Sequence, residues 1–134
     1  MTTIRLIMEK YINKTYPQNK ISYNGDLVRI RYSTSLKTHH PLYNIYLKNG
    51  KIICLVGIEP NIIMYLCPQG IDRIYQFQRD IQSSLLWIQE TDGNIYGTNN
   101  NIKYPIEYVL TGLKNVTHSD GNPLNNIMDN LIIL

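Results

Sequence analysis

Apolar side chains recur at helical spacing near the start of the printed sequence. The members of this apolar face are Ile4, Ile7, Met8, Tyr11 and Ile12. Their i, i+3, i+4, i+7 spacing is typical of an amphipathic helix. Thr2 or Thr3 can cap its beginning, and Pro17 lies just beyond its end. The pattern predicts a helix over residues 3–14.

Strict alternation of apolar and polar positions follows in residues 26–33. The alternating residues are Val28, Arg29, Ile30, Arg31 and Tyr32. A strand with one buried face has this pattern. Asn24-Gly25 is a good turn sequence, so residues 20–23 are expected to form a short partner strand.

A second hairpin is centred on Asn49-Gly50, a pair that suits a two-residue type I′ turn. With that turn, three apolar pairs face each other across the strands. The pairs are Leu47 with Ile52, Ile45 with Cys54, and Tyr43 with Val56. A slip of one residue would mix the faces, so the pattern supports its own register. It also points Cys54 into a core, where cysteines without a disulfide are commonly found.

Residues 52–58 and 62–66 are apolar on both faces. Such strands need cover on both sides, from helices on one side and from a second helix layer or a partner chain on the other. The loop around Glu59-Pro60-Asn61 leaves their register open. A loop of three residues places Cys54 and Cys67 on opposite faces, whereas a loop of two or four makes them cross-strand neighbours.

The next segment, residues 71–88, fits two patterns. Its first part, 71–84, has helical spacing, and the strand pattern is favoured after that. Asp92-Gly93 invites a hairpin between 86–90 and 94–97. We therefore expect a helix followed by a hairpin.

Two further helices are predicted by their boundary residues. Pro105 can begin a short helix over 105–111, with Gly112 as its stop. Asn122 can cap a last helix over 123–132 with Pro123 at its first position. The apolar stripe of this last helix consists of Leu124, Ile127, Met128 and Leu131.

Together these elements predict one α+β domain over residues 1–134, with an N-terminal helix, a mostly antiparallel sheet of about four to six strands and C-terminal helices. The composition agrees, because the 134 residues include 21 Ile and 11 Tyr but no Ala. Ile and Tyr suit strands, and Ala is the best helix former. The AT-rich codons of Ile, Asn and Tyr hint at a low-GC bacterium, a phage or a virus.

Composition also excludes several classes of protein. No apolar run reaches the roughly 18 residues that a membrane span needs. Charged residues at Arg5, Glu9 and Lys10 argue against a secretory leader. Two cysteines do not make a disulfide framework, so we expect an intracellular, cytoplasmic protein with both thiols reduced.

Charge is unevenly distributed along the chain. Residues 1–67 hold nine Lys or Arg and three Asp or Glu, whereas residues 68–134 hold four and seven. A sheet that presents basic and tyrosine side chains can pair phosphates and stack bases, which would suit a single-stranded nucleic acid. The candidate residues are Arg29, Arg31, Lys37, Tyr46, Lys48 and Lys51. The alternative interpretation is an ordinary solvated face whose basic residues block edge pairing.

Signals for catalysis are few. The sequence has no glycine-rich phosphate loop, no paired Cys-x-x-Cys, no His-Glu-x-x-His and no Gly-x-Ser-x-Gly. His118 could act as a general base oriented by Asp120, which would suit a small hydrolase. The three histidines could instead hold a metal, or all three could be solvated loop residues, which is the interpretation we favour. No cofactor or metal is expected.

The sequence favours a small, non-catalytic binding or adaptor protein that acts by protein–protein contact. The apolar residues expected to pack on the body or at an interface are Leu131, Ile132, Ile133 and Leu134. Exposed apolar surface of this kind is costly, so a homodimer is expected to cover it together with the unprotected sheet face. The alternatives are the nucleic-acid-binding protein and the hydrolase described above, and the partner is not identified by the sequence.

Overall fold

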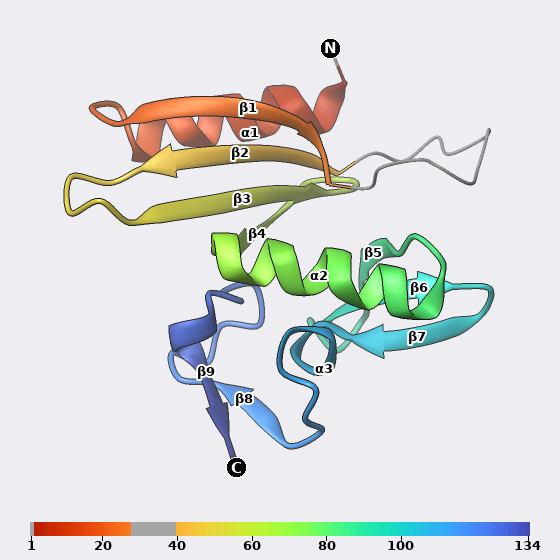
Figure 1. The fold of residues 1–134 in the computed structure, drawn as a ribbon. Helices are drawn as coiled ribbons and strands as arrows, with labels where there is room; N and C mark the ends of the chain where they lie inside the picture. The colour runs from red at the N-terminus through yellow and green to blue at the C-terminus, as the bar shows by residue number, and fades with distance from the viewer. Residues whose placement is uncertain (1, 28–39) are drawn as a thin grey trace.

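The computed structural model describes residues 2–27 and 40–134 (Figure 1). The helices are α1 (Thr3–Thr15), α2 (Pro68–Ile81) and α3 (Ile106–Thr111), together with a single 3-10 turn, η1 (Met128–Asn130). The strands are β1 (Lys20–Asp26), β2 (Pro41–Tyr46), β3 (Ile52–Ile58), β4 (Ile62–Leu66), β5 (Leu86–Gln89), β6 (Ile95–Asn99), β7 (Ile102–Pro105), β8 (Val116–His118) and β9 (Leu131–Ile133). They form sheets in the orders β1-β2-β3-β4, β5-β6-β7 and β8-β9, in which every strand pair is antiparallel. The α+β class predicted from the sequence is confirmed.

One face of the four-stranded sheet is covered by α1 (Figure 1). Thr2 caps this helix by accepting a hydrogen bond from the backbone N–H of Arg5 at 3.4 Å. The buried residues that join helix and sheet are Ile4, Met8, Ile12, Tyr43, Ile45 and Leu55. Gly57 allows the close approach, because a Cβ there would lie 2.6 Å from the Met8 sulfur and 2.7 Å from Ile4 Cγ1. The predicted first helix is therefore confirmed, and its apolar stripe is what holds it to the sheet.

The opposite face of this sheet is covered by α2 and by the β5-β6-β7 sheet. A single cluster of buried side chains runs from Val56 and Leu66 on the first sheet through Ile74 on α2 to Trp87 and Ile95 on the second sheet. Both faces of β3 are thus covered from within the chain. The need for a partner chain on this face, which contributed to the homodimer prediction, is removed.

His40 links the two larger sheets from a fully buried position. Its ring nitrogen Nδ1 lies 2.9 Å from the carbonyl oxygen of Gly57 on β3, and its Nε2 accepts a hydrogen bond from the backbone N–H of Trp87 on β5 at 2.9 Å. Since Nε2 accepts, Nδ1 must carry the proton and donate to Gly57. The expectation of a solvated loop histidine is wrong for His40, while His39 lies outside the described residues.

The β2–β3 hairpin forms as predicted, but its register differs by one residue. Tyr46 pairs with Ile52 and Asn44 with Cys54, where the sequence pattern pairs Ile45 with Cys54. The reason is the turn: Gly50 adopts φ +85°, its N–H donates to the Leu47 carbonyl, and Leu47 N–H donates to the Lys51 carbonyl. This is a three-residue loop with a left-handed glycine, the next commonest hairpin connection after the two-residue turn. Both faces of the β2–β3 hairpin carry enough apolar side chains to accept this one-residue shift in register.

The β3–β4 loop settles the cysteine alternatives. Ile58 pairs with Ile62, so Glu59-Pro60-Asn61 is a three-residue loop, and Cys54 lies opposite Leu66. Cys67 directly follows Leu66, so the alternation of side chains along the strand places Cys67 on the face opposite Cys54. Neither cysteine forms a disulfide. Cys54 is buried as predicted, because the shifted register still points it into the molecule.

The turn predicted at Asn24-Gly25 is wrong. β1 continues through it to Asp26 and pairs with β2, with an irregularity between Tyr23 and Asp26 where Gly25 adopts φ +77°. The left-handed glycine is accommodated as a distortion within the strand, so no reversal is needed. Residues 28–33, which make up most of the strand predicted over 26–33, lie outside the described residues.

The middle of the chain matches its prediction closely. The helix expected over 71–84 is α2, which begins earlier, at Pro68, because proline suits a first helical position, and ends earlier, at Ile81. The expected hairpin is β5–β6, and the short helix expected over 105–111 is α3, ended by Gly112 at φ +76°.

The helix predicted over 123–132 is wrong. Residues 119–130 form turns and η1, and the chain then enters β9. Side chains of this segment bond its own backbone: Asn122 Oδ1 accepts from Leu124 N–H at 3.0 Å, and Asp120 Oδ1 accepts from Asn122 N–H at 2.9 Å. Short amide and carboxylate side chains compete with helical hydrogen bonds in this way. The sequence signals that suggested a helix cap in fact make a chain of turns.

Candidate binding surfaces

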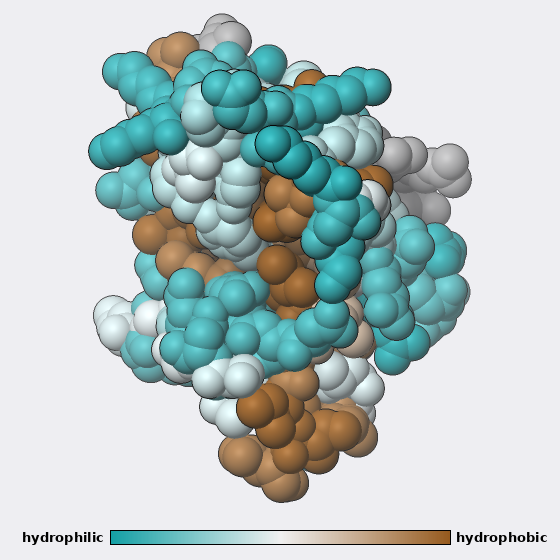
Figure 2. Space-filling model, turned by 90° about the vertical axis from the view of Figure 1, so that its left-hand side faces the viewer, coloured by the Kyte–Doolittle hydropathy of each residue, from teal (hydrophilic) through white to brown (hydrophobic). Residues whose placement is uncertain are grey.

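The first candidate surface is the ribbon formed by β8 and β9, at the bottom of the molecule in Figure 1. Figure 2 shows apolar side chains gathered over this end. Ile132 is 44% exposed, Ile133 66% and Leu134 80%. Leu131 packs against the main core instead, so it anchors the ribbon and leaves the three following residues in solvent. The sequence predicted all four at an interface, and three of them are exposed.

The outer edges of the sheets differ in how they are protected. β1 carries Lys20 and Asp26, and β7 carries Lys103; charges on edge strands discourage pairing with another chain. The edge of β4 is covered by residues 124–126, since the N–H of Tyr65 donates to the Leu124 carbonyl at 2.8 Å. The edge of β5 meets His40 through the Trp87 N–H.

The ribbon has none of these protections among the described residues. β8 reads Val-Thr-His and β9 reads Leu-Ile-Ile, without a lysine, arginine or carboxylate in either. The two strands pair only with each other in the described part of the chain. An uncharged strand edge with exposed apolar side chains is suited to pairing with a further strand.

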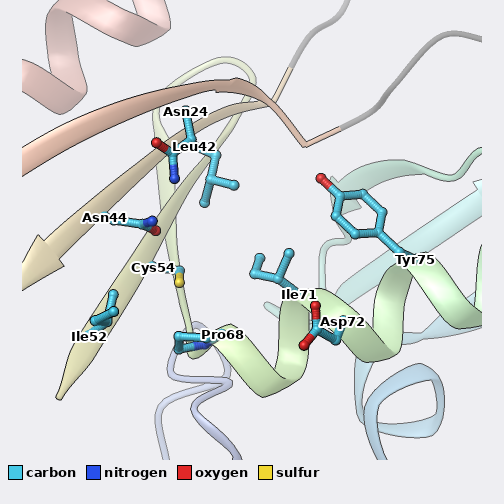
Figure 3. A pocket seen from close by; sticks show the side chains of 9 residues that line it. All are labelled: Asn24, Leu42, Asn44, Ile52, Cys54, Pro68, Ile71, Asp72 and Tyr75. Carbon is cyan, nitrogen blue, oxygen red and sulfur yellow. The ribbon is translucent and has the colours of Figure 1, made fainter.

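The second candidate surface is a cavity of about 460 Å³ between the four-stranded sheet and α2 (Figure 3). Its apolar lining consists of Leu42, Ile52, Cys54, Pro68 and Ile71. Its polar lining consists of Asn24, Asn44, Asp72 and Tyr75. Most small-molecule sites have this size and this mixture of an apolar surface with a few polar groups.

Asn44 and Cys54 lie side by side on the sheet wall of this cavity, as a cross-strand pair of β2 and β3. The side-chain oxygen Oδ1 of Asn44 is buried and has no hydrogen-bond partner among the described residues. Burial raises the pKa of the Cys54 thiol to about 12. Because the thiolate is the reactive form of cysteine, Cys54 is a neutral wall of the cavity and no nucleophile at neutral pH.

The opposite wall of the cavity is the first half of α2. Asp72 is exposed at the opening, and Tyr75 is half-buried one turn further along the helix (Figure 3). Among the described residues that line the cavity, Asp72 is the one that carries a charge. The cavity therefore has the Asp72 carboxylate at its opening and, deeper inside, the Asn44 side-chain oxygen, an acceptor without a hydrogen-bond partner in the described residues.

The structure pairs His118 with residues other than Asp120. His118 Nε2 lies 2.8 Å from Asn126 Oδ1 and 3.7 Å from Glu107 Oε1, with both His118 and Glu107 side chains largely buried. Asp120 accepts hydrogen bonds from the side chains of Asn125 and Asn130, each at 2.9 Å.

These bonds lower the pKa of Asp120 to about 2. Asp120 thus serves the turns of residues 119–130, and it does not orient His118. A cavity of about 400 Å³ lies beside Glu107, lined also by Tyr104, Tyr108, Lys114 and Val116. His118 is not among its lining residues.

The candidate nucleic-acid residues are only partly described. Arg29, Arg31 and Lys37 lie outside the described residues, whereas Tyr46, Lys48 and Lys51 surround the β2–β3 turn. Tyr46 already has neighbours: the Lys20 ammonium lies 5.5 Å from its ring centre, and its hydroxyl lies 3.1 Å from Ser22 Oγ. The nucleic-acid hypothesis stays a prediction.

No family model matches the chain, and neither a curated protein nor a solved structure is similar to it. None of the helices in the described part of the chain combines the length and apolar character needed to cross a lipid bilayer. Within residues 2–27 and 40–134, no group of three His, Cys, Asp or Glu side chains could hold a metal ion.

The sequence pattern missed two of these features. Nothing in the local pattern around His40 distinguished a buried histidine from one in a loop, because both of its partners come from distant strands. Asn44 was missed because the predicted register placed it on the face away from Cys54, and only the one-residue shift makes them neighbours.

Proposed function

We propose that this is a small, non-catalytic binding protein that acts through protein–protein contact, with the β8–β9 ribbon as its contact surface and a second copy of the chain as its partner. The observation that carries the proposal is the outer edge of β9, which is exposed, apolar and uncharged. Every sheet edge outside this ribbon, in the described residues, carries charge or is covered. A strand edge left in this state is a site for pairing.

A second copy fits this edge for a geometric reason. Two identical strands that run antiparallel are related by a two-fold axis, and each supplies the same edge to the other. Pairing β9 with β9 of a second copy extends each ribbon into a four-stranded sheet in the order β8-β9-β9-β8. With the axis at Ile132, this residue meets its own equivalent and Ile133 lies opposite Leu131 of the second copy, without charges to repel the copies. Leu113, which is 43% exposed, offers further apolar area near α3.

Light scattering coupled to size exclusion tests this proposal. At micromolar concentration the protein should show about twice the chain mass of 15.6 kDa. The variant Ile132→Lys should run as a monomer, because it places two like charges across the axis. Leu6→Lys is the matched control: Leu6 is 48% exposed on α1, far from the ribbon in sequence, so that variant should stay dimeric.

Two results contradict the proposal. A wild-type protein that remains monomeric up to the highest soluble concentration removes the second copy as partner. Equal dissociation by Ile132→Lys and Leu6→Lys shows that association depends on general surface hydrophobicity and not on the β9 edge.

A further inference from the structure

Two buried side-chain atoms in the described part of the chain lack a hydrogen-bond partner: Asn44 Oδ1 and Trp87 Nε1. A buried acceptor without a partner costs about 1–3 kcal/mol, so such atoms need an explanation. Trp87 is 1% exposed within the core, where no ligand reaches it. Asn44 differs, because it lines an open cavity (Figure 3).

We propose that the cavity between the four-stranded sheet and α2 binds a small organic cation, an ammonium or guanidinium group on a short apolar body. Asn44 Oδ1 accepts a hydrogen bond from the cation, and the Asp72 carboxylate supplies the opposite charge at the opening. The apolar body lies against Leu42 and Ile71. This site is separate from the ribbon and does not depend on the dimer proposed above.

The charge of the ligand follows from the lining. Asp72 is the one charged residue in the described part of the lining, where an anion would meet its carboxylate and gain no cation in exchange. A neutral donor could satisfy Asn44 but would leave the Asp72 charge unused. A cation uses both groups, and charge-assisted hydrogen bonds are the stronger kind.

The ligand is bound without being transformed. The thiol nearest to Asn44 belongs to Cys54, which burial keeps protonated at neutral pH. Asp72 is exposed at the opening, where solvent screens its charge. The lining residues that the structure describes therefore supply recognition groups, and no activated nucleophile is among them.

NMR titration with three probes of equal chain length tests the proposal: n-butylammonium, n-butanol and n-butyrate. Butylammonium should give saturable shifts of the Asn44 side-chain amide and of the backbone amides of residues 71–75, and binding should weaken as salt is added. Butanol should bind more weakly, and butyrate should not bind. Asp72→Asn should weaken butylammonium by up to about fivefold, the loss expected when one solvent-exposed opposite charge is removed.

Two variants separate recognition from folding. Asp80→Asn removes the same charge from the same helix but outside this cavity, so it should leave binding within about twofold. Asn44→Leu should abolish binding while the protein keeps or gains thermal stability, because it removes the unsatisfied acceptor. The proposal is overturned if butylammonium gives no saturable shifts, if butyrate or butanol binds as well, or if Asp72→Asn and Asp80→Asn behave alike.

Discussion

Replacing His40 tests the link between the two larger sheets. In His40→Phe the ring volume is kept, but the backbone N–H of Trp87 and the carbonyl of Gly57 lose the partners that the imidazole now supplies at 2.9 Å each. Each buried group left without a partner costs about 1–3 kcal/mol, so the variant should lose about 2–6 kcal/mol. That is a large part of the roughly 5–15 kcal/mol that holds a typical domain folded.

Chemical denaturation followed by both circular dichroism and fluorescence measures this loss. Trp87 is the single tryptophan of the chain and is 1% exposed, so its emission reports directly on the contact that His40 makes. In the variant the emission of the native protein should shift to longer wavelength if the β5 edge opens. His40→Asn should recover part of the stability, because its amide can replace Nδ1 toward Gly57 but is too short to reach Trp87.

His118→Phe is the control for this experiment. It removes a hydrogen bond between two side chains, His118 and Asn126, far from the tryptophan in sequence and in a different sheet. It should cost less and leave the Trp87 emission unchanged. The reasoning is refuted if His40→Phe unfolds within about 0.5 kcal/mol of the wild type, the range of an unimportant surface substitution.

Two other predictions follow from shifted pKa values. Asp120 has its pKa lowered to about 2 by hydrogen bonds from Asn125 and Asn130, so its contribution to stability is present above its unfolded value and is lost as the pH falls toward 2. The wild type should therefore lose stability as the pH falls from about 4 to 2, and Asp120→Asn should show a smaller loss over the same range; parallel profiles for the two proteins would contradict this, with Asp129→Asn as the control. Thiol labelling of the native protein should modify Cys67 first and Cys54 only on unfolding, since raising the Cys54 pKa to about 12 lowers its thiolate fraction by about a thousandfold. Rapid labelling of both thiols, with Cys54→Ser to assign them, would show that Cys54 is not buried.

Local sequence signals predicted the elements that depend on local physics. The apolar stripe of α1 with its Thr2 cap, Gly112 at the end of α3, and the β5–β6 turn at Asp92-Gly93 each require only neighbours in sequence. The register of β2–β3 was missed because Asn-Gly serves both two-residue and three-residue loops, and both registers bury apolar side chains. Only packing between α1 and the rest of the sheet distinguishes the two.

Features that join distant parts of the chain could not be predicted in the same way. His40 bonds residues on β3 and β5, and the edge of β4 is covered by residues 124–126. A helix in residues 123–132 would have satisfied the backbone hydrogen bonds of this segment internally. In the fold observed, backbone groups of Leu124 and Asn126 form hydrogen bonds with Tyr65 on β4 instead. The sequence shows which residues can form a helix, and the tertiary partner decides whether they do.

The asparagine side chains of this protein fall into two groups: those that complete turns, and Asn44 at the proposed binding site. The amide of Asn49 accepts from the Lys51 N–H, Asn122 accepts from Leu124 N–H, and Asn130 donates to Asp120, so each completes a turn of its own segment. In these places the side chain replaces a missing backbone partner, as short amides commonly do. Asn44 is in the middle of a regular strand, where the backbone needs no such help. The buried side-chain oxygen of Asn44 therefore completes no turn and has no hydrogen-bond partner in the described residues. A donor from outside the chain, bound in the cavity beside α2, would supply the hydrogen bond that the other amides obtain locally.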